Sequence, residues 1–327
     1  MRRGGRLPYH WVDKRPRRGG RDMTPRMVLE GIYTPVITPF GADGSIDFDA
    51  LADLVERLVA AGVHGLISGG STGENYAETV EERLELARFI TERADGRLPV
   101  IVGTGAMRTP DSVALAQGAR EMGADAILLG TPPYSVPTEA ENAANALEID
   151  RAADLPVILY NYPGRMGVSM GREFLDIVSQ SPNVIGIKES SGDVNRIHTL
   201  ACDYPQIQMS CGMDDQALEF FAWGARSWIC AGSNFLPEEH VALYEACAVR
   251  GDFATGRRIM TAMMPLMGVL EQGGKFIQCV KHGVETTGLR AGPMRPPLQG
   301  LNDGEKVELE AVIATLKTAV QAIVEGK

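Results

Sequence analysis

Eight short apolar segments, separated by segments of helical pattern, constrain the fold of this chain more than any other feature of its sequence. Each segment has the length of one buried strand. Most are continuously apolar rather than alternating, which is typical of parallel strands covered on both faces. They span residues 32–38, 64–70, 100–105, 126–132, 157–162, 184–190, 207–213 and 227–233.

The intervening segments carry helix signals. Residues 47–62 place their apolar side chains on one helical face. Thr79 with Glu82, and Thr138 with Glu141, match the capping box that begins many helices. Eight such βα units predict an α/β fold, the (β/α)8 TIM barrel. A doubly wound sheet could also hold eight parallel strands, but the turn after the first segment, PFGADG, lacks the glycine pattern of a dinucleotide site.

Strand-like segments stop after residue 236, and the rest of the chain has helical patterns. We therefore predict a catalytic barrel over residues 27–236 and a C-terminal helical region over 237–327. Residues 1–26 are predicted to be a basic N-terminal extension, because residues 1–22 hold eight Lys or Arg and two Asp. This extension is interpreted as a disordered arm or as sequence derived from a vector or start site; a functional basic tail is the alternative.

Composition excludes several classes of function. The net charge is −10 despite the basic extension, which argues against nucleic acid as the main partner. No apolar run reaches the roughly 18 residues of a membrane-spanning helix, so we expect no membrane partner. The five cysteines form no C-x-x-C pair. Cys211 and Cys230 lie in apolar strand-like segments and are predicted to be buried free thiols, which indicates a reducing, cytoplasmic location. The five histidines are far apart, so no metal site is expected.

Active sites of such barrels lie at the carboxyl ends of the strands, so polar residues that end each segment are the candidates. Hydroxyls, one arginine and one lysine gather there, which suits a small anionic carbonyl compound. The candidate positions are Thr38, residues 70–74, Pro133 and Tyr134, residues 160–165, residues 188–190 and residues 212–215.

Lys188 ends the sixth apolar segment, VIGIKES, and is the main catalytic candidate. The chain has 25 Arg and seven Lys, so arginine is its ordinary cation and a lysine at this position is a specific choice. An arginine cannot lose its proton in a protein, whereas a desolvated lysine can do so and attack a carbonyl carbon. The alternative is a structural lysine that reaches solvent or pairs with Glu189. Lys275 and Lys281 are predicted to be surface residues of the helical region.

The other candidates also have structural alternatives. The loop GGSTGE, residues 69–74, can offer backbone N–H groups and hydroxyls to a carboxylate, or it is only a tight turn. Tyr160 and Tyr134 could be ordinary aromatic residues of the barrel rim. Arg165 follows a Pro-Gly turn at a strand end, which favours anion binding over a surface role.

Three motifs together, GGSTGE, YNYPGR and GIKESSGD, resemble those of the dihydrodipicolinate synthase / N-acetylneuraminate lyase family of pyruvate-dependent class I aldolases. The resemblance extends from about residue 31 to residue 298. It implies a (β/α)8 barrel with C-terminal helices, a homotetramer built from two dimers, and no metal or organic cofactor. It also implies that Lys188 forms an imine with pyruvate or another 2-oxo acid, with Tyr160 as the general acid and base.

The resemblance assigns roles to the remaining candidates. Ser71 occupies the position of a relay threonine, and Tyr134 matches a tyrosine that reaches into the neighbouring subunit's site. Thr72 and neighbouring backbone amides would hold the keto-acid carboxylate, and Gly70 is a further substrate-binding position. Arg165 matches an arginine that binds the carboxylate of the second substrate. Two further pocket positions are implied, the main-chain carbonyl of Ile229 and Gly212.

The branch of the family stays open at this point. Arg165 in YNYPGR resembles the synthase branch, which joins pyruvate to aspartate semialdehyde, and this lyase or synthase activity is the leading hypothesis. Ser71 and the GMDD motif, residues 212–215, resemble the sialate and sugar-acid branches. The alternative is therefore an aldolase or dehydratase of 2-keto-3-deoxy sugar acids or sialate, or a related catabolic deaminase. A non-catalytic binding barrel is a third possibility, against which the Lys188–Tyr160 pair argues.

Overall fold

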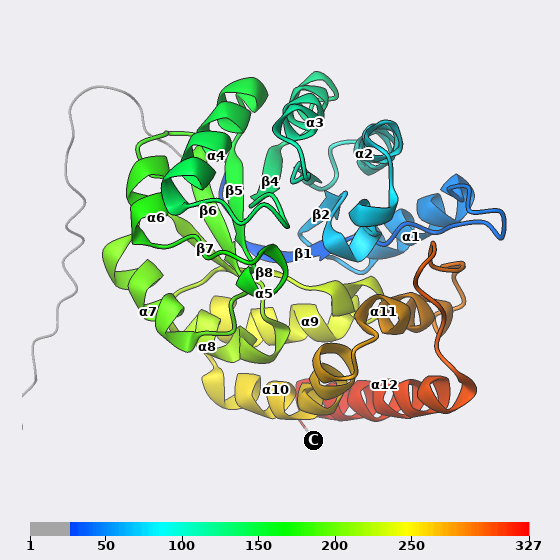
Figure 1. The fold of residues 1–327 in the computed structure, drawn as a ribbon. Coiled ribbons are helices and arrows are strands. Elements are labelled where there is room, and N and C mark those ends of the chain that lie inside the picture. The colour runs from blue at the N-terminus through cyan, green and yellow to red at the C-terminus, as the bar shows by residue number, and fades with distance from the viewer. Residues whose placement is uncertain (1–26, 327) are drawn as a thin grey trace, which may run out of the picture.

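The structure is a computed structural model that describes residues 27–326, and the predicted basic extension lies outside this range. Within these residues, eight parallel strands close into a barrel in chain order, β1 to β8, and β8 pairs with β1. This confirms the predicted (β/α)8 architecture (Figure 1). The strands are β1 (Gly31–Pro35), β2 (Gly65–Ser68), β3 (Val100–Gly103), β4 (Ala126–Gly130), β5 (Val157–Asn161), β6 (Val184–Glu189), β7 (Gln208–Cys211) and β8 (Ser227–Ile229).

Helices surround the barrel, and a group of later helices lies along one side of it, coloured yellow to red in Figure 1. The helices are α1 (Phe48–Ala60), α2 (Val80–Ala94), α3 (Thr109–Glu121), α4 (Glu139–Ala153), α5 (Pro163–Met166), α6 (Arg172–Val178), α7 (Val194–Asp203), α8 (Ala217–Ala222), α9 (Pro237–Tyr244), α10 (Phe253–Met267), α11 (Phe276–Glu285) and α12 (Asp303–Val324). Helix α9 contacts β1, whereas α10 and α11 both pack against α12. The division of the chain at residue 236 stays a prediction.

The local helix signals act as the sequence predicts. Both capping boxes form: the Thr79 hydroxyl accepts from the N–H of Glu82 at the start of α2, and Thr138 does the same for Glu141 at the start of α4. Each cap satisfies donors that the first turn leaves unpaired, which typically contributes about 1 kcal/mol. The apolar face of α1 is buried against the barrel, and Gly62 adopts a φ of 80° just after that helix.

The barrel has a small apolar core of its own, separate from the larger core between strands and helices. Tyr33, Ile67, Leu128 and Ile158 are among its members, and Tyr160 lies at its end. This interior is packed, as in other barrels of this kind, so a ligand can enter only above it. Each apolar segment of the sequence continues beyond its strand, and the excess residues form the loops of the mouth.

Strand β6 contains an irregularity that affects which side chains point inward. Val157 pairs with Val184, but Ile158 pairs with Gly186, so Ile185 is an extra residue in β6. A bulge of this kind re-aims the side chains that follow it. Beyond it, Ile187 belongs to the outer core and Lys188 has the opposite orientation, toward the barrel axis.

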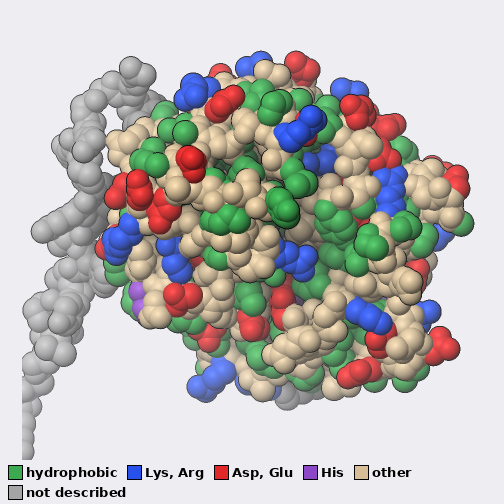
Figure 2. Space-filling model, viewed as in Figure 1, with side chains coloured by type: hydrophobic (Ala, Val, Ile, Leu, Met, Phe, Trp, Pro, Cys, Tyr) green, Lys and Arg blue, Asp and Glu red, His purple; other side chains and the backbone are tan. Residues whose placement is uncertain are grey.

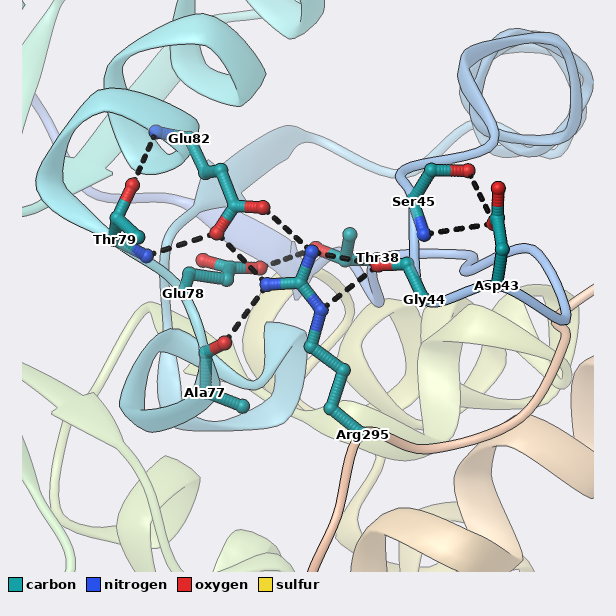
Figure 3. A network of polar contacts seen from close by, with 9 residues as sticks. All are labelled: Thr38, Asp43, Gly44, Ser45, Ala77, Glu78, Thr79, Glu82 and Arg295. Carbon is teal, nitrogen blue, oxygen red and sulfur yellow. Dashed lines mark hydrogen bonds and ion pairs between the residues drawn. The ribbon is translucent and has the colours of Figure 1, made fainter.

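Arg295 lies in the segment between α11 and α12, and its hydrogen bonds anchor this segment to the loops that follow β1 and β2 (Figure 3). Its guanidinium donates to the carbonyl oxygens of Gly44 and Ala77 and to the carboxylate of Glu82, and it lies 4.3 Å from the centroid of the Phe40 ring. Glu82 therefore serves both Arg295 and the capping box of α2. This contact holds residues 297 and 298 against the barrel mouth, where they help to line the cavity described below.

No helix among residues 27–326 is long and apolar enough to cross a membrane. Acidic and basic side chains are interspersed over the face seen in Figure 2. Cys211 and Cys230 are buried, as predicted.

Candidate active site

A cavity of about 410 Å³ lies at the carboxyl ends of the strands, between the barrel mouth and the C-terminal helices. This is the end at which barrel enzymes carry their active sites. Of the nine residues with an expected role in the site, all but Gly70 and Tyr134 line this cavity. Those that line it are Ser71, Thr72, Tyr160, Arg165, Lys188, Gly212 and Ile229.

Lys188 and Tyr160 are neighbours across the β5–β6 pairing, so their side chains leave the sheet on the same side. The Lys188 Nζ lies 4.4 Å from the centroid of the Tyr160 ring, and each residue is 8% exposed. The side chain of Glu189 points the other way, because its oxygens accept from Asn161 Nδ2 and from the N–H of Ser191. The alternative in which Lys188 pairs with Glu189 is therefore wrong.

Gly212 has no room for a side chain. A Cβ at this position would come within 2.6 Å of Lys188 Cγ and 2.1 Å of the Ser190 hydroxyl. The same hydroxyl donates to the carbonyl oxygen of Gly212 at 2.8 Å. Glycine at position 212 allows the ends of β6 and β7 to pack closely, and it leaves space for the Lys188 side chain to extend into the cavity.

The GGSTGE loop forms a 3₁₀ turn over Ser71–Gly73 at the end of β2. Gly70 precedes the turn and its carbonyl oxygen accepts from the N–H of Gly73, which fixes the direction in which Ser71 and Thr72 face the cavity. Thr72 is 4% exposed. The loop ends at Glu74, whose φ of 64° is unusual for a residue with a side chain.

The buried carboxylate of Glu74 is paired with Lys281 of α11, at 2.7 Å between Oε1 and Nζ. The prediction that Lys281 is a surface residue is wrong: its side chain is 2% exposed, and it also donates to the carbonyl oxygen of Pro293. Burial lowers the pKa of the Lys281 amine, and the charge of Glu74 opposes that effect. Lys275, in contrast, is half-exposed and pairs with Glu305.

Arg165 enters the cavity from α5, the short helix that begins at Pro163 directly after β5. Its guanidinium carbon lies 5.6 Å from the centroid of the Tyr162 ring, and the Tyr160 and Tyr162 ring centroids are 6.0 Å apart. The arginine is exposed and supported by an aromatic face, which suits the capture of an anion arriving from solvent.

Tyr134 does not reach the cavity of its own chain. It is 89% exposed and has a φ of 71°, in the loop that follows β4. A bulky residue with this backbone conformation is uncommon and needs a local reason.

Several residues that line the cavity have no role assigned from the sequence, and the signals for them differ. Tyr162 and Asp214 stand within the motifs YNYPGR and GMDD, so their neighbourhood in the sequence indicated them. Tyr76, Glu271 and Gln278 also line the cavity. Glu271 lies in a π-helical turn, Gly268–Gln272, and Gln278 in α11. Their segments carry only helical patterns, and nothing local indicates that they close over the barrel mouth.

Asp214 is a buried carboxyl group in the cavity wall. Its Oδ1 accepts from the Trp228 indole nitrogen at 2.8 Å, and it is 3% exposed. Burial raises the pKa of this carboxyl from its ordinary value of 3.8 to about 7, and the charge of Glu271 adds to the effect. At neutral pH the fold therefore carries a carboxyl group that resists ionisation.

Asp214→Asn should stabilise the protein more at pH 8 than at pH 5. A carboxyl whose pKa is raised on folding is held in its protonated form by the fold. Its contribution to the free energy of unfolding is complete below the unfolded pKa and is lost as the pH rises through about 7, where the buried group must ionise. The amide keeps an acceptor for Trp228 and has no charge to bury. Urea unfolding at both pH values, at one protein concentration, measures the difference. An equal difference in stability at the two pH values would contradict the assignment.

Within residues 27–326, no group of three or more His, Cys, Asp or Glu side chains is arranged to hold a metal ion. The chemistry available in the cavity is that of an amine, three tyrosines, the hydroxyls of Ser71 and Thr72, an arginine and two carboxyl groups. A closed barrel with these reactive groups in a cavity at the strand ends is the arrangement of TIM-barrel enzymes.

Comparisons with known proteins give the family. The profile of the dihydrodipicolinate synthetase family matches residues 28–316. A 4-hydroxy-tetrahydrodipicolinate synthase from Exiguobacterium sibiricum is 35% identical over 294 residues, which cover 90% of this chain and all of the relative. This chain belongs to the dihydrodipicolinate synthetase family, and it is a lyase or synthase of the class I aldolase superfamily.

Solved structures agree with this assignment. The 4-hydroxy-tetrahydrodipicolinate synthase from Methylacidiphilum fumariolicum SolV superposes with a TM-score of 0.86 at 28% identity, over 91% of this chain and 99% of the other. A prophage protein of the dihydrodipicolinic acid synthase family from E. coli K12, solved in complex with pyruvate, gives a TM-score of 0.83 at 31% identity, over 89% and 99% of the two chains.

Proposed function

We propose that this enzyme joins pyruvate to aspartate semialdehyde through an imine on Lys188. The observation that carries the proposal is the placement of Lys188, which lies in the cavity beside Tyr160 while its neighbour Glu189 is turned away. Relatives named 4-hydroxy-tetrahydrodipicolinate synthase and a family member solved with pyruvate support it.

In the proposed reaction, the Lys188 amine attacks the C2 carbonyl carbon of pyruvate and water leaves, which forms the imine. Loss of a proton from C3 gives an enamine, and C3 then attacks the aldehyde carbon of the second substrate. Tyr160 carries protons in these steps, with Ser71 beside it. The amino group of the joined product then attacks C2 and releases Lys188. The imine itself draws electrons from C3, so the reaction needs no metal or organic cofactor.

The two carboxylates of the substrates have separate binding groups in this proposal. Thr72 and the backbone of the turn that begins after Gly70 hold the carboxylate of pyruvate, close to Lys188. The carbonyl oxygen of Ile229 and the Gly212 position complete that part of the pocket. Arg165, exposed at the outer edge, holds the carboxylate of the aldehyde substrate.

The proposed assembly is a homotetramer made of two dimers. An exposed Tyr134 with a positive φ is consistent with a residue that is held by a neighbouring subunit and completes that subunit's proton relay. We also propose a cytoplasmic location and small molecules as the only substrates, with neither nucleic acid nor membrane as a partner. These statements stay predictions.

Arg165→Ala should reduce kcat/KM for aspartate semialdehyde by about 10- to 100-fold, because the substrate carboxylate loses a charge-assisted hydrogen bond. Trapping of the pyruvate imine should be retained, since the proposal assigns Arg165 to the carboxylate of the second substrate and not to pyruvate. Arg172→Ala is a matched control, because Arg172 begins the next helix and pairs with Asp203 outside the cavity. An Arg165→Ala enzyme with unchanged kinetics would rule out the synthase assignment.

A second candidate function is favoured by the carboxyl groups of the cavity. Asp214 and Glu271 could accept hydrogen bonds from the hydroxyl groups of a 2-keto-3-deoxy sugar acid or sialate. Assays of the purified enzyme with aspartate semialdehyde, sialate and keto-deoxy sugar acids decide between the two. The proposed function requires the highest kcat/KM for aspartate semialdehyde.

A further inference from the structure

Glu271 brings a carboxyl group to the cavity from the C-terminal helices, opposite the barrel mouth. It lies in the π-helical turn between α10 and α11, and it lines the same cavity as Lys188 and Arg165. Burial raises the pKa of its carboxyl group, the charge of Asp215 raises it further, and the charges of Lys188 and Arg165 lower it. Glu271, Lys188 and Arg165 therefore share one cavity, although Glu271 belongs to a different part of the fold.

Asp214 places a second carboxyl group in the wall of this cavity, on the side of β7. Its pKa is raised first by burial and next by the charge of Glu271. One of its oxygens is held by the Trp228 indole, so the group has a fixed position. A cation placed near Glu271 and Asp214 would stabilise both carboxyl groups as anions.

The charge balance changes during the proposed reaction, on which this inference rests. When Lys188 becomes an enamine nitrogen it no longer carries a positive charge, and pyruvate adds a carboxylate. The cavity is then more negative than before, at the stage when the aldehyde must enter. Arg165 can compensate the carboxylate of that aldehyde. Glu271 and Asp214 then lack a cation, and a substrate ammonium group would provide one.

We propose that Glu271 is a specificity-determining residue that binds the ammonium group of the second substrate. The preferred aldehyde is then a zwitterionic amino acid, with its carboxylate on Arg165 and its ammonium on Glu271. Two-point binding of this kind fixes the aldehyde carbon relative to the enamine, and it rejects compounds that carry only one of the two charges.

The test compares two aldehydes on the wild type and on Glu271→Gln. Aspartate semialdehyde carries the ammonium group, whereas succinate semialdehyde has the same carbon chain and carboxylate without it. We expect Glu271→Gln to lower kcat/KM for aspartate semialdehyde by about 10- to 100-fold. Succinate semialdehyde lacks the amino group that releases Lys188, so it is measured by its inhibition constant against aspartate semialdehyde, which should change little in Glu271→Gln.

The controls separate a recognition role from a structural one. Glu245→Gln makes the same substitution in another π-helical turn, Glu245–Val249, which does not line the cavity. It should change neither kcat/KM for aspartate semialdehyde nor the inhibition constant of succinate semialdehyde. Borohydride trapping of pyruvate verifies that each variant keeps its lysine site. If Glu271→Gln weakens the use of aspartate semialdehyde and the binding of succinate semialdehyde equally, or weakens neither, this inference is overturned and the proposed function is not affected. A wild type that traps pyruvate but does not turn over aspartate semialdehyde would overturn the proposed function as well.

Discussion

Lys188→Arg should abolish turnover, with a loss of about 10⁴-fold or more, and should leave no borohydride-trapped adduct with pyruvate. Arginine keeps the positive charge and most of the length of the side chain, but it cannot lose its proton and act as a nucleophile. If Lys188 only provided charge or packing, arginine would retain much of the function. The measurement is intact-protein and peptide mass spectrometry after reduction in the presence of pyruvate, together with initial rates.

Lys275→Arg is the matched control for this experiment. Lys275 is half-exposed and pairs with Glu305, so its replacement should leave both the adduct and the rate unchanged. Because Gly212 leaves little space around the Lys188 stem, a bulkier side chain could also disturb β7. Lys188→Met, which is unbranched and neutral, tests for this effect and should be equally inactive. An adduct at another residue in Lys188→Arg would show that the mechanism is wrong.

The barrel and the position of Lys188 could be predicted from the sequence because their signals are local. A strand segment such as VIGIKES is continuously apolar because helices cover it, and its first polar residue indicates where the strand meets the mouth. The capping boxes at Thr79 and Thr138 are equally local, since the hydrogen bonds join residues three positions apart. Such features need no knowledge of which distant segments pack together.

The burial of Lys281 could not be predicted because its partner lies far away in the sequence. In α11 it reads as one more polar residue of an amphipathic helix, and only contact with Glu74 and Pro293 accounts for a charged group in the interior. Glu271 is missed for the same reason: its turn becomes part of the site only when α10 and α11 close over the mouth. Arg295, which fastens the next segment to Glu82, depends on the same long-range packing.

Lys281→Met should destabilise the protein by about 3–5 kcal/mol, the usual cost of removing one partner of a buried ion pair. The Lys281 Nζ lies 2.7 Å from Glu74 Oε1, and the two side chains are 2% and 0% exposed. Methionine fills much the same space, so the loss would come from leaving the Glu74 carboxylate buried without its cation. Denaturant unfolding at pH 7 measures the change in the free energy of unfolding.

Two further variants test whether the loss of stability in Lys281→Met comes from the Glu74–Lys281 ion pair or from a general effect on α11. Lys275→Met removes a half-exposed lysine from the residue that precedes α11, and its loss should be about 1 kcal/mol or less. Adding Glu74→Gln to Lys281→Met should recover part of the stability, because an amide is less costly to bury than an unpaired carboxylate. Equal losses for Lys281→Met and Lys275→Met would contradict the interpretation. Since Glu74 ends the loop that carries Thr72, Lys281→Met should also raise the KM for pyruvate, which would link this buried pair to the substrate site.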